Sequence, residues 1–160
     1  TKKPWEGNGP METPWNLISA SPISFNDNFA TPKEMTLEDM AEIKAQFVQA
    51  AKNADEAGFD MIELQTHHGF LLASFLSPLT NIRTDEFGGS IENRLKYPLA
   101  IFKAIRDVFP TEKPISVRIS ATDWAENGIS EQEVITIATA LKSAGADIIN
   151  VSTGNKKNLL

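Results

Sequence analysis

Helical and strand-like segments alternate along most of the chain, and this alternation limits the fold more than any other feature of the sequence. Thr36 and Asp39 resemble a capping box, and apolar residues then recur at helical spacing until Gly58. This pattern predicts a helix over residues 37–57. The apolar, partly alternating run over residues 59–65 is too short for a helix and is typical of a strand.

The same order of a capped helix followed by a strand occurs twice more. Ser90 is predicted to cap a helix that extends to Val108, and Ser130 begins another that ends at Gly145. Each helix is followed by a strand, so the predicted strands cover residues 59–65, 113–120 and 146–152. Because parallel neighbours need long crossovers, helices between strands predict a parallel α/β sheet with right-handed connections.

The first 35 residues are rich in Pro, Asn and Gly, and we predict a long loop there. Only residues 17–19 and 23–25 resemble short strands, which allow a small hairpin. The chain is interpreted as one domain, with a loop over residues 1–35 and helix–strand repeats over residues 36–160. We expect four aromatic residues to anchor the loop rather than to cover a substrate: Trp5, Trp15, Phe25 and Phe29.

Polar residues at alternate strand positions distinguish two architectures for such a sheet. In a doubly wound open sheet, both faces are covered and the strands are continuously apolar. A (β/α)8 barrel whose interior faces a ligand gives strands with one polar face, so we favour a barrel. A whole barrel needs about 250 residues, and the three strand–helix units predicted here form only its middle part. The polar positions are Glu63, Gln65, Ser116, Arg118, Ser120, Asn150 and Ser152.

Two charged residues of this face, Glu63 and Arg118, are expected at similar heights on neighbouring strands. An unpaired buried charge is costly, so we expect the two to pair with each other or to contact a charged ligand. The chemistry of the residues alone leaves a structural ion pair and a ligand contact equally open.

The composition excludes several classes of function. A net charge of −6 and a pI near 4.9 argue against a nucleic-acid partner. No apolar run approaches the ~20 residues that span a bilayer and no signal peptide is recognised, so we expect a cytoplasmic protein without membrane contact. Because the chain has no cysteine, it holds no disulfide, thiolate nucleophile or iron–sulfur cluster, and redox chemistry requires a bound cofactor.

One segment carries a family signature. Residues 77–81 read Ser-Pro-Leu-Thr-Asn, and residues 83–94 read Arg-Thr-Asp-Glu-Phe-Gly-Gly-Ser-Ile-Glu-Asn-Arg. This segment is similar to the signature of the old yellow enzyme family, the NADH:flavin oxidoreductases, which bind FMN in a (β/α)8 barrel. Residues 3–7 and 117–120 also resemble the family, so that the resemblance covers essentially the whole chain as a central fragment of the barrel domain. Four segments most resemble the reductase-like half of salicylyl-CoA and anthraniloyl-CoA oxygenases: residues 15–21, 32–36, 71–75 and 119–124.

The resemblance implies roles for individual residues. Arg118 corresponds to the arginine beside N1 and O2 of the flavin, where a fixed cation stabilises the negative charge of the reduced ring. His68 corresponds to the second of a pair that hydrogen-bonds a substrate oxygen, and Gln65 corresponds to the first, usually a histidine. Phe70 stands where the family has the tyrosine that protonates the substrate. His67, which is adjacent to His68, is expected to be an exposed structural histidine.

The function implied by the resemblance is reduction of a small-molecule substrate, an activated alkene or a CoA-linked compound, with FMN as cofactor and NAD(P)H as reductant. A non-catalytic ligand-binding relative is the alternative, which Gln65 and Phe70 support. A lyase or aldolase is disfavoured because no lysine stands late in a strand. No metal site is predicted, since His67 and His68 are adjacent and only Glu63 is nearby.

The family's other strands supply further flavin contacts. We therefore expect this chain alone to bind FMN weakly or not at all and to be inactive. Sheet edges and apolar helix faces that a whole barrel would cover favour association, so we expect a homo-oligomer.

Overall fold

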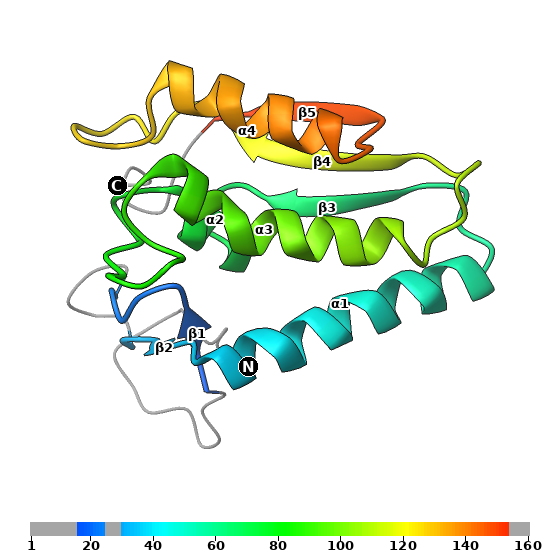
Figure 1. Ribbon diagram of the computed structural model, residues 1–160, viewed down its shortest axis with the longest axis horizontal. Coiled ribbons are helices and arrows are strands. Elements are labelled where there is room, and N and C mark those ends of the chain that lie inside the picture. Colours follow the sequence, from blue (N-terminus) through cyan, green and yellow to red (C-terminus); the bar gives the residue numbers. More distant parts are fainter. Residues whose placement is uncertain (1–15, 25–29, 154–160) are drawn as a thin grey trace.

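The computed structural model describes residues 16–24 and 30–153, and its centre is a parallel sheet (Figure 1). The strands are β3 (Ile62–Thr66), β4 (Ile115–Ser120) and β5 (Ile148–Ser152), in the order β3-β4-β5. Both neighbouring pairs run parallel. The prediction of a parallel sheet with helical crossovers is therefore confirmed for this part of the chain.

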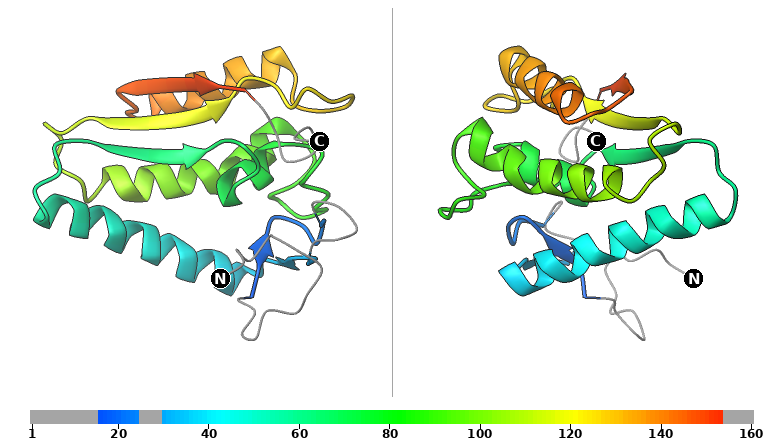
Figure 2. Two further views of the ribbon diagram at one scale, coloured as in Figure 1. Left: turned by 180° about the vertical axis from the view of Figure 1, so that it is seen from behind. Right: turned by 45° about the vertical axis from the view of Figure 1, so that its right-hand side comes forward.

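Helices cover one face of the sheet, and within the described residues the other face carries none (Figures 1 and 2). Helix α1 (Leu37–Glu56) precedes β3, α3 (Ile91–Arg106) lies between β3 and β4, and α4 (Glu131–Ser143) connects β4 to β5. Helix α3 packs against both α1 and α4. No helix among the described residues is long and apolar enough to span a membrane. Because the strands are parallel, their carboxyl ends all lie at the same end of the sheet, which is where α/β enzymes bind their ligands.

The predicted N-caps are present at these helices. The Thr36 hydroxyl accepts from Asp39 N and the Ser130 hydroxyl accepts from Glu133 N. In both boxes the acidic side chain accepts in return from the backbone N–H of the cap, and Ser90 caps α3 with its hydroxyl. These bonds satisfy N–H groups that have no partner within the helix.

Helices α1 and α4 end in the same way: a glycine with positive φ follows each helix shortly after its last turn and separates it from the next strand. Gly58 and Gly145 have φ of 82° and 103°, a region that glycine adopts at little cost. The N–H groups of each glycine and of the next residue donate to carbonyls of the last helical turn. Strands β3 and β5 therefore begin at Ile62 and Ile148, a few residues later than predicted.

A short helix, α2 (Leu71–Leu76), lies between the strand predicted over residues 59–65 and the helix predicted from Ser90, where no helix is predicted. No side chain caps its N-terminus, and every residue after Leu71 is buried. The helix packs against α3 and β3. Burial therefore accounts for a helix that is too short to be stable by itself, and a run of this length has no periodicity that separates helix from loop.

Two short strands lie in the predicted loop at the start of the chain. Strands β1 (Ile18–Ser19) and β2 (Lys33–Glu34) pair in parallel, so they do not form the predicted hairpin. The buried guanidinium of Arg83 holds them, because its Nη1 donates to the carbonyls of Ala20 and Met35 (3.0 and 2.9 Å). The aromatic residues expected to anchor this loop lie outside the described residues: Trp5, Trp15, Phe25 and Phe29.

The hydrophobic core lies between the sheet and the helices. Side chains alternate between the two faces of a strand, and Leu64 on β3 and Val117 on β4 are buried against the helices. The polar residues predicted for the other face are those that the helices leave uncovered. The largest fully buried side chains include Phe75, Phe102, Leu72, Ile101, Ile115, Ile119, Ile137 and Leu141.

Candidate functional site

A tight turn at the carboxyl end of β3 carries two of the predicted site residues. Phe70 N donates to the carbonyl of His67 (3.1 Å), and the central residues, His68 and Gly69, have φ of 52° and 72°. Positive φ at both central positions is typical of a type I′ turn. A histidine in this conformation is strained, and such strain is concentrated at functional sites.

His68 contacts both of the other strands. Its backbone N–H donates to Ser120 Oγ at the end of β4 (3.0 Å). Its Nε2 lies 3.0 Å from Ser152 Oγ on β5 and 2.9 Å from the carbonyl oxygen of Thr153. Because a carbonyl oxygen only accepts, Nε2 carries the proton, and a neutral ring has its lone pair on Nδ1.

Arg118 lies on β4, in the middle of this end of the sheet. It pairs in register with Gln65 on β3 and Asn150 on β5. Its Nη2 is 3.5 Å from Ser152 Oγ, so one hydroxyl group contacts both Arg118 and His68. Its Nε is buried and has no hydrogen-bond partner within the described part of the chain. A buried guanidinium N–H without an acceptor is costly, which favours a ligand that supplies one.

Of the two alternatives left open for Glu63 and Arg118, an ion pair between them does not form in the described part of the chain. The register places Glu63 opposite Ser116, two residues before Arg118 on the same face of β4. Glu63 Oε2 accepts from Ser116 Oγ (2.8 Å) and from Asn150 Nδ2 (2.9 Å). The hydrogen bond from Asn150, with smaller effects of Ser116 and Arg118, lowers the pKa of Glu63. Neutral groups thus satisfy the carboxylate, and no ion pair with Glu63 occupies the guanidinium of Arg118 in the described residues.

His67 is buried, contrary to the prediction of an exposed histidine. Its exposed fraction is 5%, and its ring centroid lies 4.0 Å from that of His68 and 5.9 Å from that of Phe70. Because the chain reverses immediately after His67, its side chain packs against the turn instead of pointing into solvent. Burial, followed by the charges of His68 and Arg118, lowers the pKa of His67, so the imidazole is neutral at pH 7.

Gln65 and Phe70 complete the set of predicted site residues, and both are exposed. Gln65 lies on the open face of β3 opposite Arg118, where its amide offers a hydrogen bond but no charge. Phe70 occupies the N-cap position of α2, and 51% of it is exposed. The structure therefore brings Gln65, His68 and Arg118 together at one end of the sheet and places Phe70 at its rim.

Sequence reasoning missed the roles of Ser120 and Ser152, which it recognised only as polar strand residues. They are the last residues of β4 and β5 and pair in register with each other. Their hydroxyl groups contact the backbone and the ring of His68. A serine at the last position of two neighbouring parallel strands, on the face of Arg118, is the signal that identifies them, because such positions converge.

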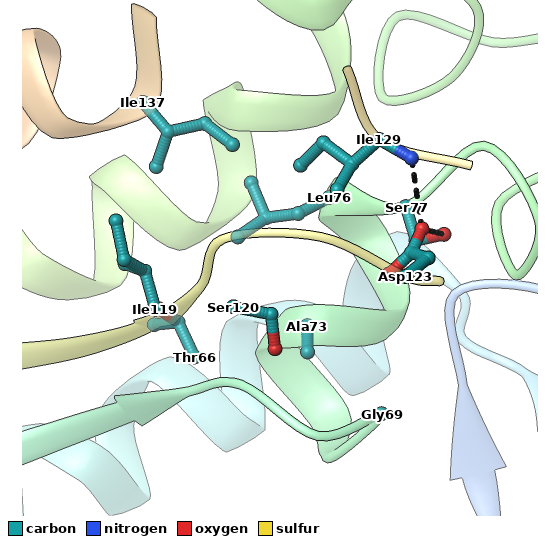
Figure 3. Close-up of a pocket in the computed structure, with 10 residues that line it drawn as sticks. All are labelled: Thr66, Gly69, Ala73, Leu76, Ser77, Ile119, Ser120, Asp123, Ile129 and Ile137. Carbon is teal, nitrogen blue, oxygen red and sulfur yellow. Dashed lines mark hydrogen bonds between the residues drawn. The ribbon is translucent and has the colours of Figure 1, made fainter. Parts of the chain in front are cut away.

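A small cavity of about 20 Å³ lies behind the turn, on the helix-covered side of the sheet (Figure 3). Thr66 and Gly69 line it together with α2 and the loop after β4. Ser77 Oγ donates to Asp123 Oδ2 (2.6 Å), which also accepts from Ile129 N (2.9 Å). Pockets for cofactor-sized ligands measure about 300–1,000 Å³. This cavity is therefore too small for a cofactor, and the residues that line it support the turn.

The segment with the family signature, residues 77–94, has a structural role. The side-chain amide of Asn81 donates to two backbone carbonyls (2.7 and 2.8 Å). Buried Arg94 donates to the carbonyl of Leu76 at the end of α2 and to Glu133 on α4. These hydrogen bonds connect the loop to α2 and α4, and α2 directly follows the turn that carries His68.

Comparison with known proteins gives one family. The profile of the NADH:flavin oxidoreductase / NADH oxidase family matches residues 5–158. NADPH dehydrogenase from Clostridium acetobutylicum is 44% identical over 138 residues, which are 86% of this chain and 40% of that protein. NADPH dehydrogenase from Listeria welshimeri is 42% identical over 146 residues, 91% of this chain and 43% of that protein. The chain thus spans about two fifths of the length of these relatives.

Solved structures show the same fold. A structure of 2-naphthoyl-CoA reductase with 2-naphthoyl-CoA has a TM-score of 0.79 and 31% identity over 94% of this chain and 23% of that chain. Morphinone reductase has a TM-score of 0.77 and 25% identity over 88% of this chain and 42% of that chain. The predicted α/β fold, part of a (β/α)8 barrel, is thereby confirmed. The resemblance recognised in residues 77–94 is confirmed as well, because the profile covers nearly the whole sequence: the chain belongs to the NADH:flavin oxidoreductase / NADH oxidase family.

Proposed function

We propose that this chain forms one wall of the active site of an oxidoreductase that uses FMN and NAD(P)H. The observation that carries the proposal is the buried Nε of Arg118, which has no acceptor among the described residues. The N1 and O2 edge of a flavin supplies such acceptors, and a fixed cation there stabilises the negative charge of the reduced ring. Membership of the family and the NADPH dehydrogenase relatives support the same cofactor and reductant.

FMN, when bound, supplies the two-electron chemistry between NAD(P)H and a small-molecule substrate. Gln65 and His68 hold an oxygen atom of that substrate by hydrogen bonds, which polarises a carbonyl group. Gln65 is exposed on the open face and free to turn toward a ligand. The Nε2–H of His68 faces Ser152 and Thr153, so a substrate oxygen that takes this hydrogen bond replaces these two partners.

Reduction of a carbon–carbon double bond requires a proton in addition to a hydride. Phe70, at the rim of the site, has no proton to give, and Gln65 has no acidic group. Water or another group therefore supplies the proton at this site, and Phe70 contributes an apolar surface to the substrate.

The substrate class is an activated alkene or a CoA-linked compound. The similarity to 2-naphthoyl-CoA reductase, at 31% identity over 94% of this chain, supports a CoA-linked substrate. The rings of Phe70 and Trp124 are exposed, and these residues come shortly after β3 and β4 in the sequence. Such rings suit a substrate with an apolar or aromatic body.

Titration of the chain with FMN, followed by flavin fluorescence, tests the role of Arg118. We expect weak binding by the unaltered chain, no measurable binding by Arg118→Met, and partial binding by Arg118→Lys, which keeps the charge but loses the planar donors. Lys142→Met, an exposed change on α4, is the matched control and should bind like the unaltered chain. Equal affinity of Arg118→Met and the unaltered chain would refute the assignment. Flavin that stays at one per chain through gel filtration would refute weak binding.

A non-catalytic ligand-binding relative is the second candidate, favoured by Phe70 and Gln65. A chimaera decides between the two: this chain replaces the matching 138 residues of the Clostridium acetobutylicum NADPH dehydrogenase, with and without Phe70→Tyr. A large gain in enone reduction with Phe70→Tyr supports a catalytic site that lacks its proton donor. No gain in a chimaera that holds FMN supports a binding function. The unaltered dehydrogenase is the control for assembly.

A further inference from the structure

His67 is the buried histidine of the turn, and the proposed function gives it no role. Its exposed fraction is 5%, and its Nδ1 has no hydrogen-bond partner within the described part of the chain. Buried side-chain polar atoms nearly always have a partner, so an exception needs a physical reason. The nearest ring is that of His68, whose centroid is 4.0 Å away at an interplanar angle of 44°.

The main chain of His68 is fixed more firmly than its ring. The turn and the hydrogen bond from its N–H to Ser120 Oγ determine the backbone but leave the side-chain torsions free. The hydrogen bonds of Nε2 to Ser152 and Thr153 are partly exposed, so water competes for them. Contact with the ring of His67 is a further restraint on the orientation of the His68 ring.

The charged groups around His67 favour its neutral form. They are Glu63 on β3, His68 in the same turn and Arg118 on β4. Burial lowers the pKa of His67, the positive charges of His68 and Arg118 lower it further, and Glu63 opposes them. A buried lone pair without a partner is tolerated better than a buried N–H, so the neutral ring carries its proton on Nε2. Such a ring keeps its tilted contact with the ring of His68 without a charge of its own.

We propose that His67 is a positioning residue whose neutral imidazole supports the ring of His68 and keeps its Nε2–H directed toward Ser152 and Thr153. Contact between flat rings, and not a hydrogen bond of His67, provides this support. The inference rests on the proposed function in one respect, namely that His68 is the residue that binds the substrate. His67 then acts on the substrate only through His68.

The chain has only these two histidines, so imidazole-detected NMR reports on them without interference. The measured quantity is the rate at which the Nε2 proton of His68 exchanges with solvent. His67→Phe retains a flat ring without nitrogen atoms, and His67→Leu is the matched control that retains apolar volume without a ring. We expect slow exchange in the unaltered chain and in His67→Phe, and exchange faster by about fivefold or more in His67→Leu, as expected for loss of a hydrogen bond.

Slow exchange in His67→Leu would overturn the proposal, because any apolar group would then suffice. Fast exchange in His67→Phe would also overturn it, because a nitrogen atom of His67 would then be needed. Amide exchange at Val117 and Ile119 on buried β4 shows whether each variant keeps the fold, and the comparison is made between variants that do. The measurement contains no flavin, so its outcome is independent of whether Arg118 binds FMN.

Discussion

Tyr97 is the single tyrosine of the chain, and its environment gives a clean test of the packing between α1 and α3. Its hydroxyl donates to the carbonyl of Met40 at 3.0 Å, and the residue is 4% exposed. Burial raises the pKa of Tyr97 to about 12. The charged phenolate is thus disfavoured in the folded chain relative to the unfolded chain.

The pH dependence of Tyr97 follows from the sign of this shift. Because the folded pKa lies above the unfolded value of about 10, the contribution to stability is complete below pH 10 and is lost as pH rises through the interval up to 12. Ultraviolet titration should show no phenolate band near pH 10 while the circular dichroism remains native. Tyr97→Phe should remove this alkaline dependence and cost about 1 kcal/mol at neutral pH. A phenolate band near pH 10 in the folded chain contradicts the prediction.

Individual site residues were predictable only in part. Gln65, His68 and Arg118 lie together as the resemblance implies, because strand alternation and parallel order bring them to one face and one end. His67 was predicted to be exposed because sequence neighbours usually point in different directions. The positive φ of His68 and of Gly69, which no spacing rule reveals, turns the chain so that both histidines pack together.

Two neighbouring glycines lie shortly before α3. Gly88 precedes α3, and a Cβ at this position would lie 2.0 Å from the carbonyl oxygen of Arg83. Gly89 has φ of 79°, and a Cβ there would meet nothing within 4 Å. The first glycine is therefore required by close backbone approach and the second only by backbone conformation.

Alanine at these two positions should separate the two effects. Gly88→Ala forces the backbone away from Arg83, whose guanidinium contacts the end of β1. We expect the free energy of unfolding to fall by about 3 kcal/mol, the upper end of the range for overpacked sites. Gly89→Ala meets no clash and should lower the free energy of unfolding only by the cost of a left-handed backbone at a residue with a Cβ, about 1–2 kcal/mol. Urea unfolding of both variants measures the difference. Equal costs, or a larger cost for Gly89→Ala, would show that the loop yields at Gly88.

The longer helices were predictable and the shortest was not. Capping boxes at Thr36 and Ser130 predict where α1 and α4 begin. Their hydrogen bonds join residues three apart, so the sequence alone reveals them. Helix α2 has no cap and owes its structure to burial beneath α3, which is a tertiary effect. The same holds for the pairing of β1 with β2, because Arg83, 63 and 48 residues from Ala20 and Met35, adds hydrogen bonds to the carbonyls of both residues.

At the scale of the whole molecule, the sheet is open on two sides in the described part of the chain. Strands β3 and β5 are its edges, and each has one neighbour only. The alternation of helices and strands predicts the parallel order but not whether further strands complete the sheet, because closure depends on partners distant in sequence or in another chain. On β5, Ile148 is 45% exposed and Val151 is 60% exposed.

An edge strand with exposed apolar side chains favours pairing with another copy of the chain. We expect light scattering to show concentration-dependent association of the isolated chain. Val151→Lys places a charge on the β5 edge and should shift the chain toward the monomer, as charged edge residues do in natural sheets. Ile82→Lys is the matched control, since Ile82 is 63% exposed in the loop between α2 and α3, outside the strands, and should leave association unchanged. A monomer at all concentrations, or equal effects of the two lysines, would show that the β5 edge is not the associating surface.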